Sequence, residues 1–295
     1  MPTFDTPEPI AVSLELGVGD IRIAASDRAD TVVEVRPSDP SKEADVTAAE
    51  QTRVEYVDGR LLVKAPKGWR QYTSRGIGES IDVEIAVPAG SRVEGDAGVA
   101  VLHSTGRVGE LRFKTGAGEI HLDQTGPLEI RTGAGDVSVE NAAGQAEIRT
   151  GSGALQLGSV DGPAVVRNAN GDTWIGRVAG DLRVNAANGR IAVEQPHASV
   201  VAKSANGDIL LGAVAHGEVL AETGFGKVDI GVVDGVAAWL ELKTSFGRVN
   251  NDLDSATRPA PGEDAVEIRA RTSFGDITIR RAPRTQNDAS ERNVP

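Results

Sequence analysis

The chain has 295 residues, with 31 Lys and Arg against 43 Asp and Glu, so its formal net charge is −12. It contains no Cys, which excludes disulfides, thiolate metal sites and cysteine nucleophiles. An acidic chain binds a phosphate backbone poorly, so we expect no nucleic-acid partner. Only 3% of the residues are aromatic, so the core must consist mainly of Val, Ile, Leu and Ala.

The N-terminus shows no secretion signal, because no basic segment is followed by an apolar run. No stretch of about 18 apolar residues occurs in the chain, so we expect no membrane span. The sequence therefore predicts a cytoplasmic protein.

Residues 1–90 have strand character without a regular repeat. Residues 53–64 predict a hairpin with Asp58 and Gly59 at its turn, and 37–50 are expected to include one short helix. Residues 10–16, 20–24 and 31–35 are predicted to be strands, and apolar and polar residues alternate over 80–87, as in a half-buried strand. We interpret this β-rich region as a cap, because the end of a stack of repeats would otherwise expose strand edges and core.

The loop over residues 66–78 is the best candidate binding feature. It gathers aromatic and basic side chains, namely Trp69, Arg70, Tyr72 and Arg75. A capping loop would need such residues as well, so the sequence leaves both interpretations open.

A glycine motif recurs over residues 91–280. TGAGDV (132–137), SANGDI (204–209) and TSFGDI (272–277) are examples, and a single copy, GVGDIRI (17–23), stands apart. Apolar residues alternate on both sides of each copy, so each repeat is predicted to be strand, turn, strand, turn. The second glycines are Gly118, Gly135, Gly153, Gly171, Gly189, Gly207, Gly226, Gly247 and Gly275, and a degenerate earlier copy adds Gly98.

A unit of about 18 residues cannot bury its apolar face alone, so it must stack on its neighbours. We therefore predict a parallel β-solenoid with about 18 residues per coil and a right-handed connection. Equivalent positions keep the same residue types, which stacking on a direct neighbour would favour. The alternative is an antiparallel meander of hairpins.

The residue before each second glycine predicts ladders, in which equivalent residues of successive coils lie over one another. Three Asn amides are expected to hydrogen-bond along the stack and three Phe rings to stack near its C-terminal end. The residue after the glycine alternates in charge from Asp172 to Lys227, which keeps like charges off adjacent coils. The Asn and Phe positions are Asn170, Asn188, Asn206, Phe225, Phe246 and Phe274.

The C-terminal end departs from the regular spacing. Residues 250–265 form a Pro-containing excursion between the last two copies, and residues 281–295 are polar and aperiodic. We expect this tail to be disordered.

The TGAGDV and SANGDI units and the closing TSFGDITIRR resemble the DUF4097 family of bacterial "putative adhesins", which are YvlB-like β-solenoid proteins. The resemblance covers nearly the whole chain and is strongest over 95–280. It implies a β-solenoid of undefined biochemical role and transfers no catalytic residues.

Motifs for chemistry are missing from the sequence. It has no G-x-S-x-G, P-loop or H-E-x-x-H, and the repeated glycines precede strands where a dinucleotide site needs a helix. We therefore predict no catalytic residue, no cofactor and no metal site. The four histidines, at different repeat phases and so without a ligand ladder, are His103, His121, His197 and His216.

Three classes of function follow. A non-catalytic interaction or scaffold protein with a protein partner is favoured. A bactofilin-like self-assembling scaffold and a carbohydrate-active β-helix enzyme are the alternatives, the latter because Glu119 and Asp136 are expected one coil apart. The sequence leaves the partner and the oligomeric state open.

Overall fold

The computed structural model describes residues 1–66, 79–253 and 265–283. The fold is all-β, built from parallel strands wound as a β-solenoid with an N-terminal β region. The chain divides into two compact units, Met1–Ala154 (unit 1) and Leu155–Pro295 (unit 2). Within the described ranges, no helix has the length and apolar character needed to cross a membrane.

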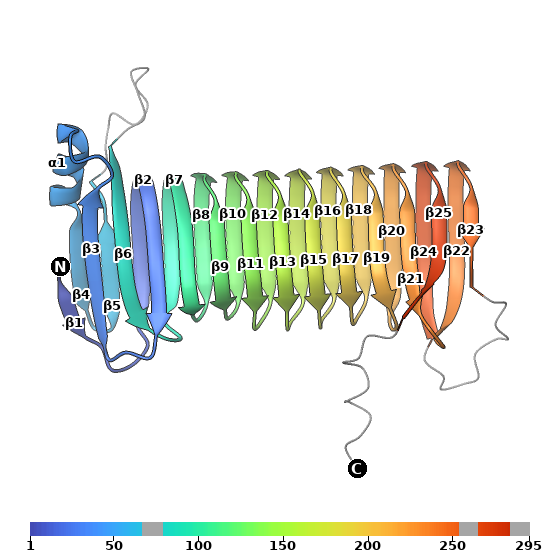
Figure 1. Ribbon diagram of the computed structural model, residues 1–295, viewed down its shortest axis with the longest axis horizontal. Helices are drawn as coiled ribbons and strands as arrows, with labels where there is room; N and C mark the ends of the chain where they lie inside the picture. Colours follow the sequence, from blue (N-terminus) through green and yellow to red (C-terminus); the bar gives the residue numbers. More distant parts are fainter. Residues whose placement is uncertain (67–78, 254–264, 284–295) are drawn as a thin grey trace, which may run out of the picture. The chain divides into compact units, whose positions relative to one another are not determined.

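The described residues of unit 1 form one helix, α1 (Glu43–Gln51), and a series of strands (Figure 1). The strands are β1 (Thr3–Asp5), β2 (Ala11–Ser26), β3 (Asp30–Pro37), β4 (Arg53–Val57), β5 (Arg60–Lys64), β6 (Ser80–Pro88), β7 (Arg92–Arg107), β8 (Leu111–Ala117), β9 (Ile120–Thr125), β10 (Leu128–Ala134), β11 (Val137–Ala142) and β12 (Ala146–Ser152).

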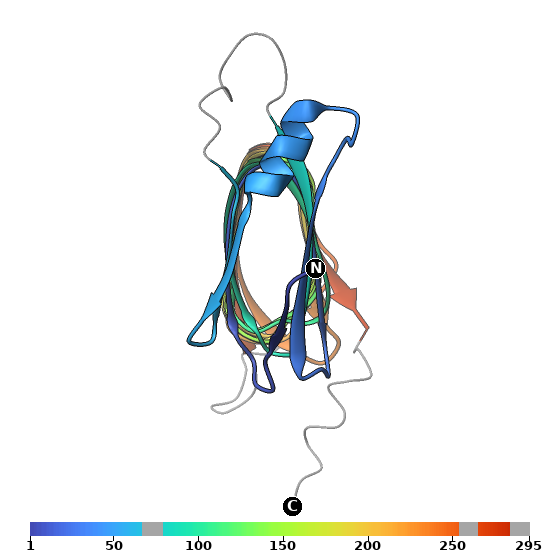
Figure 2. The same ribbon diagram turned by 90° about the vertical axis from the view of Figure 1, so that its left-hand side faces the viewer.

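Each regular coil of unit 1 contributes one strand to each of two walls. β8 pairs in parallel with β10, and β9 pairs in parallel with β11, so every strand lies beside the strand two further on. The view in Figure 2 shows the coils closing into a flattened ring. Hairpins would pair consecutive strands antiparallel, so the meander is excluded.

The isolated motif copy GVGDIRI lies inside the stack of unit 1. It belongs to β2, a single 16-residue strand where the sequence predicts two shorter ones. β2 pairs in parallel with β5 and β6 on one side and with β7 on the other. The first copy in the sequence therefore lies between strands that come later in the chain, β5 and β6 on one side and β7 on the other.

Antiparallel strands cover the end of unit 1. β3 pairs antiparallel with β6, β1 with β3, and β4 with β5. The β4–β5 hairpin is as predicted, with Asp58 at a φ of 47° and Gly59 at 75°, the left-handed conformation of a two-residue turn. The helix α1 lies beside β3 and β6 at this end (Figure 2).

Unit 2 contains only strands among its described residues. They are β13 (Leu155–Val160), β14 (Ala164–Asn170), β15 (Thr173–Val178), β16 (Leu182–Asn188), β17 (Ile191–Pro196), β18 (Val200–Asn206), β19 (Ile209–Val214), β20 (Glu218–Phe225), β21 (Val228–Val233), β22 (Ala237–Phe246), β23 (Val249–Asn251), β24 (Ala265–Phe274) and β25 (Ile277–Ala282).

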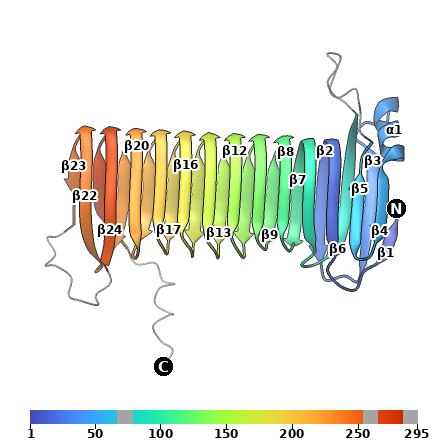
Figure 3. The same ribbon diagram turned by 180° about the vertical axis from the view of Figure 1, so that it is seen from behind.

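The last coil in the sequence is not the last coil in space. β24 pairs in parallel with β20 on one side and with β22 on the other, and β25 lies in the same way between β21 and β23. Figure 3 shows β24 between β20 and β22. The chain therefore leaves one layer open after β21, forms β22 and β23, and returns to fill that layer.

The core of each unit consists mainly of aliphatic side chains, most of them stacked on the same type of residue. Ile130 lies opposite Ile148, and Val166 opposite Val184, all with no exposed surface. Small and branched side chains stack closely at the strand spacing of about 4.8 Å. This spacing explains why the protein needs few aromatic residues for its interior.

Buried threonines hydrogen-bond to the turns of the neighbouring coil. The Thr223 hydroxyl donates to the carbonyl oxygen of Gly207 at 2.9 Å, and Thr272 donates to that of Gly226 at 3.0 Å. Each bond satisfies a carbonyl at the bend, where the chain turns from one wall to the other. The Thr of the TSFG and TGFG motifs therefore has a structural role.

The second glycine of each motif is required by the closeness of adjacent coils. Gly189 has a φ of 123°, and a Cβ at this position would lie 2.2 Å from the carbonyl oxygen of Gly171. Any side chain here would force two coils apart as well as strain its own backbone.

We therefore expect Gly189→Ala to lower the free energy of unfolding by about 3 kcal/mol or more, since it combines overlap with backbone strain. Gly59→Ala is the matched control, because Gly59 also has a positive φ but has no atom within 4 Å of a Cβ. It should cost only about 1 kcal/mol, the conformational term alone. Chemical unfolding of both variants measures the difference, and equal losses would contradict the overlap.

Candidate binding surfaces

The candidate binding loop cannot be placed. Trp69, Arg70, Tyr72 and Arg75 lie outside the described residues, as does most of the predicted tail. Ala65, which precedes the loop, and Pro66, its first residue, are described and line a groove of about 860 Å³ in unit 1.

This groove runs over the outer wall formed by β2, β7, β8 and β10, and its charges alternate in sign. Lys114 lies 3.6 Å from Asp96, and Arg131 lies 2.6 Å from Glu129. Exposed ion pairs of this kind contribute little stability, typically below about 1 kcal/mol. The balanced charges present no field of one sign, so the groove does not select an anionic or cationic ligand.

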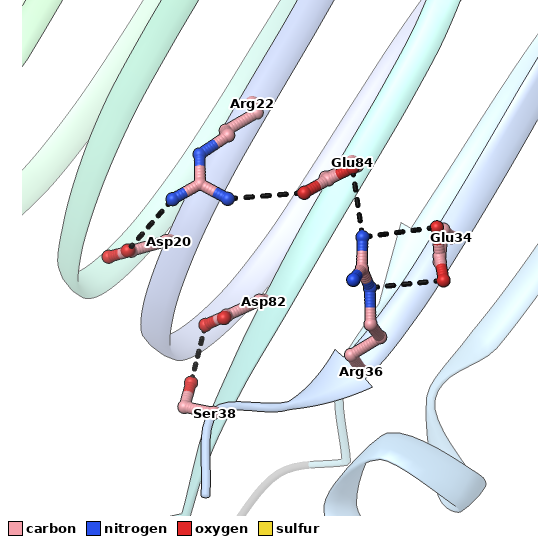
Figure 4. Close-up of polar contacts among 7 residues, drawn as sticks. All are labelled: Asp20, Arg22, Glu34, Arg36, Ser38, Asp82 and Glu84. Carbon is pink, nitrogen blue, oxygen red and sulfur yellow. Dashed lines mark hydrogen bonds and ion pairs between the residues drawn. The ribbon is translucent and has the colours of Figure 1, made fainter.

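A second polar cluster lies across β2, β6 and β3 of unit 1 (Figure 4). Glu84 accepts from both Arg22 at 3.1 Å and Arg36 at 3.0 Å, and Arg36 also contacts Glu34 at 3.0 Å. Arg22 is about half exposed, as is Arg36. A catalytic acid or base needs a desolvated or unpaired environment, and these solvated ion pairs do not supply one.

The prediction that the four histidines lie at different repeat phases is wrong for two of them. His103 on β7 lies directly opposite His121 on β9, and the two rings stack with centroids 4.9 Å apart and an 8° angle between their planes. The error came from taking Gly98 as the phase-setting glycine. In the structure that position is Ala100, because Gly118 lies against the Ala100 carbonyl and Gly116 against that of Gly98.

The stacked histidines do not make a metal centre. The neighbouring acid is Glu119, whose Oε2 lies 3.4 Å from Nε2 of His121. Across the ranges that the structure describes, no group of three or more His, Asp or Glu side chains could hold a metal ion. The pair is an exposed ladder that links two coils.

Glu119 and Asp136, the acids of the enzymatic alternative, lie one coil apart on β-strand flanks. Asp136 accepts a hydrogen bond from the backbone N–H of Ala154 at 2.7 Å, within unit 1. Glu119 contacts His121. Each carboxylate therefore has a structural partner, and neither is desolvated as a glycosidase acid must be.

The three asparagines form a hydrogen-bonded ladder on unit 2, which we call the Asn ladder. Asn188 Nδ2 donates to Oδ1 of Asn170 at 2.8 Å, and Asn206 Nδ2 donates to Oδ1 of Asn188 at 3.0 Å. The side chains are exposed, and the register of β14, β16 and β18 brings them together.

The Phe ladder continues the Asn ladder on the same line of residues, since Asn206 lies opposite Phe225. Phe225 and Phe246 each stack on Phe274 with centroids 4.8 Å apart and planes within 7°. Their order in space is 225, 274, 246, which follows from the insertion of β24. All three rings are exposed, by 57%, 45% and 66% in that order.

The alternating charges beside this line have a cause that the sequence did not reveal. Oδ1 of Asp172 accepts from the backbone N–H of Arg190 at 2.8 Å, and Asp208 does the same for Lys227. Asp276 accepts from the N–H of Arg248 at 2.8 Å. An Asp in every second coil thus binds the backbone of the next coil, and the residue on that coil carries the opposite charge.

We expect Asn188→Ala to destabilise the protein more than Asn206→Ala. The first removes both amide hydrogen bonds of the Asn ladder, and the second removes one. Each neutral hydrogen bond contributes about 1 kcal/mol. Thermal unfolding of the two variants tests this, and indistinguishable midpoints would show that the amides are held by solvent and not by each other.

The comparisons with known proteins place the chain by family and not by activity. No curated protein matches it. One similar solved structure is a "putative cell adhesion protein" from Clostridium sporogenes, with 12% identity over 95% of this chain and 98% of that chain, at a TM-score of 0.22. Another is a "putative adhesin" from Bacteroides fragilis, with 12% identity over 95% of both chains, at a TM-score of 0.32. The Toastrack DUF4097 family matches residues 11–293, and the chain is a member of that family.

Proposed function

We propose that this protein is a non-catalytic binding scaffold that holds a protein partner against the Phe ladder of unit 2. The support comes from a surface with exposed apolar side chains in a fixed arrangement. The adhesin label that the sequence resemblance brings agrees with a binding role and names no reaction.

The observation that carries the proposal is where the protein uses its few Phe residues. The sequence has five, and three of them, Phe225, Phe246 and Phe274, stand exposed in one ladder. A single exposed ring needs no explanation, but neighbouring exposed rings form the kind of patch that marks an interaction site. The aliphatic core shows that the fold does not need these rings for its interior.

The geometry of the ladder makes it a rigid surface. The rings stack on one another, and their backbones are held by parallel strand pairing on both sides of β24. Binding of a partner over the rings costs little side-chain conformational entropy, because the stacking has already ordered the rings. Aromatic side chains of this kind are enriched among the residues that dominate binding energy.

The charges beside the ladder favour a protein over a nucleic acid. Lys227 and Arg248 are each preceded in the stack by an Asp, at positions 208 and 276. The resulting strip alternates in sign and gives no net positive field for phosphates. A protein surface with apolar side chains and mixed charges at its rim fits this arrangement.

We expect the double variant Phe225→Ser and Phe274→Ser to lower the recovery of a stoichiometric partner at least tenfold in affinity capture from the source cells. The reason is that two rings that the partner would bury are lost from the interface. The circular dichroism spectrum should stay unchanged. Val57→Ser is the matched control, because Val57 is 63% exposed on the hairpin of unit 1.

Unchanged recovery with the double variant would contradict the proposal.

A glycan panel tests the enzymatic alternative. Measured turnover that is abolished by Glu119→Gln or Asp136→Asn would replace the scaffold with an enzyme.

A further inference from the structure

One end of unit 2, as far as the structure describes it, is an open sheet edge. Among the described residues, β22 pairs only with β24, and β23 pairs only with β25. The corresponding end of unit 1 is covered by antiparallel strands and by α1. The end formed by β22 and β23 therefore leaves a row of backbone N–H and C=O groups available for pairing.

The residues that face the interior at this end are only partly covered. Leu240 and Leu242 on β22 are half-buried, while their neighbours Ile268 and Ala270 on β24 are fully buried. Val249 on β23 is 45% exposed, and its neighbour Ile277 has no exposed surface. In the part of the chain that the structure describes, the end coil carries core residues and no further coil covers them.

Among the described residues, the edge has outward charges at Glu241 and Lys243 but few other features by which proteins protect a free strand. β22 is a 10-residue strand without proline, and no charged side chain points inward from it. Its outward residues include Trp239, which is 56% exposed. Such a strand is suited to pairing with another strand.

We propose that this end is a two-fold interface at which a second copy of the chain pairs its own β22 and β23 antiparallel with these strands. A rotation axis perpendicular to the wall of β22 reverses the strand direction and keeps each wall in place. It therefore sets β22 against β22 and β23 against β23, as an isologous dimer requires. The half-buried leucines of the two copies then cover one another.

The charges on β22 complement each other in one register of this pairing. With Leu242 opposite Leu242 of the second copy, Glu241 lies opposite Lys243 of the second copy, and the reverse pair forms as well. Opposite charges across an antiparallel pair are stabilising, and like charges are destabilising. The same register sets Leu240 opposite Thr244, both on the inward face.

Glu241 remains charged in this arrangement. Arg271 donates to its carboxylate at 2.6 Å and holds the pKa of Glu241 below its usual range, and Arg269 contributes from 3.5 Å. The carboxylate thus stays ionised at neutral pH and is available to attract the lysine of the second copy.

The test is sedimentation velocity on the full chain from about 1 to 100 µM, the range of an ordinary reversible dimer. We expect the wild type to reach a dimer and no larger species, because the interface uses the one open sheet edge that the described residues present at an end of the stack. Lys243→Glu places Glu opposite Glu twice and should raise the dissociation constant at least tenfold. Lys203→Glu is the matched control, because Lys203 lies on β18, away from this end, where it forms an ion pair with Glu222 at 2.7 Å. This variant should dimerise like the wild type.

A mixture of two variants tests the register. Glu241→Lys and Lys243→Glu should each be monomeric alone, and together they should form a heterodimer in which every facing pair has opposite charge. A wild type that stays monomeric throughout, a Lys243→Glu variant that dimerises normally, or growth beyond a dimer would each overturn the proposal. Should Glu241→Lys fail to fold because it loses Arg271, the Lys243→Glu result decides alone.

Discussion

The approach of one coil to the next at the glycine turns is the constraint on which this structure depends. A hydrogen atom is all that fits where Gly189 faces the carbonyl oxygen of Gly171, and the same contact recurs down the motif. It fixes the phase of each coil on its neighbour. Once the phase is fixed, every other position of the repeat is stacked on its equivalent, inside and outside.

This stacking accounts for both the interior and the surface. Inside, it lets Val, Ile, Leu and Ala fill the core in rows of like residues. Outside, it brings equivalent side chains of successive coils into contact, so that three Asn form a hydrogen-bonded row and three Phe form an aromatic surface. A change of residue type along one row is therefore a change in what the surface can bind.

The repeat made much of the fold predictable, because glycine spacing and period-two alternation report directly on turns and strands. The hairpin at Asp58 and Gly59, the parallel stacking and the neighbours within each ladder were accessible in this way. The order of the last coils was not, since β22 and β24 carry the same pattern and either could follow β20. The histidine pair was missed because Ala100 stands where the other coils have glycine. The Asp-to-backbone bonds were hidden because alternating charge has a simpler explanation in ion pairing.

The insertion of β24 and β25 has a consequence for the order in which the protein can be assembled. During synthesis, β22 and β23 leave the ribosome before the coil on which they rest exists. They have no layer beneath them until β24 and β25 have been translated. A chain that stops before β24 would therefore lack the inner layer and leave the outer one with nothing to dock on, so the integrity of this end depends on residues that are synthesised after those of the outer layer.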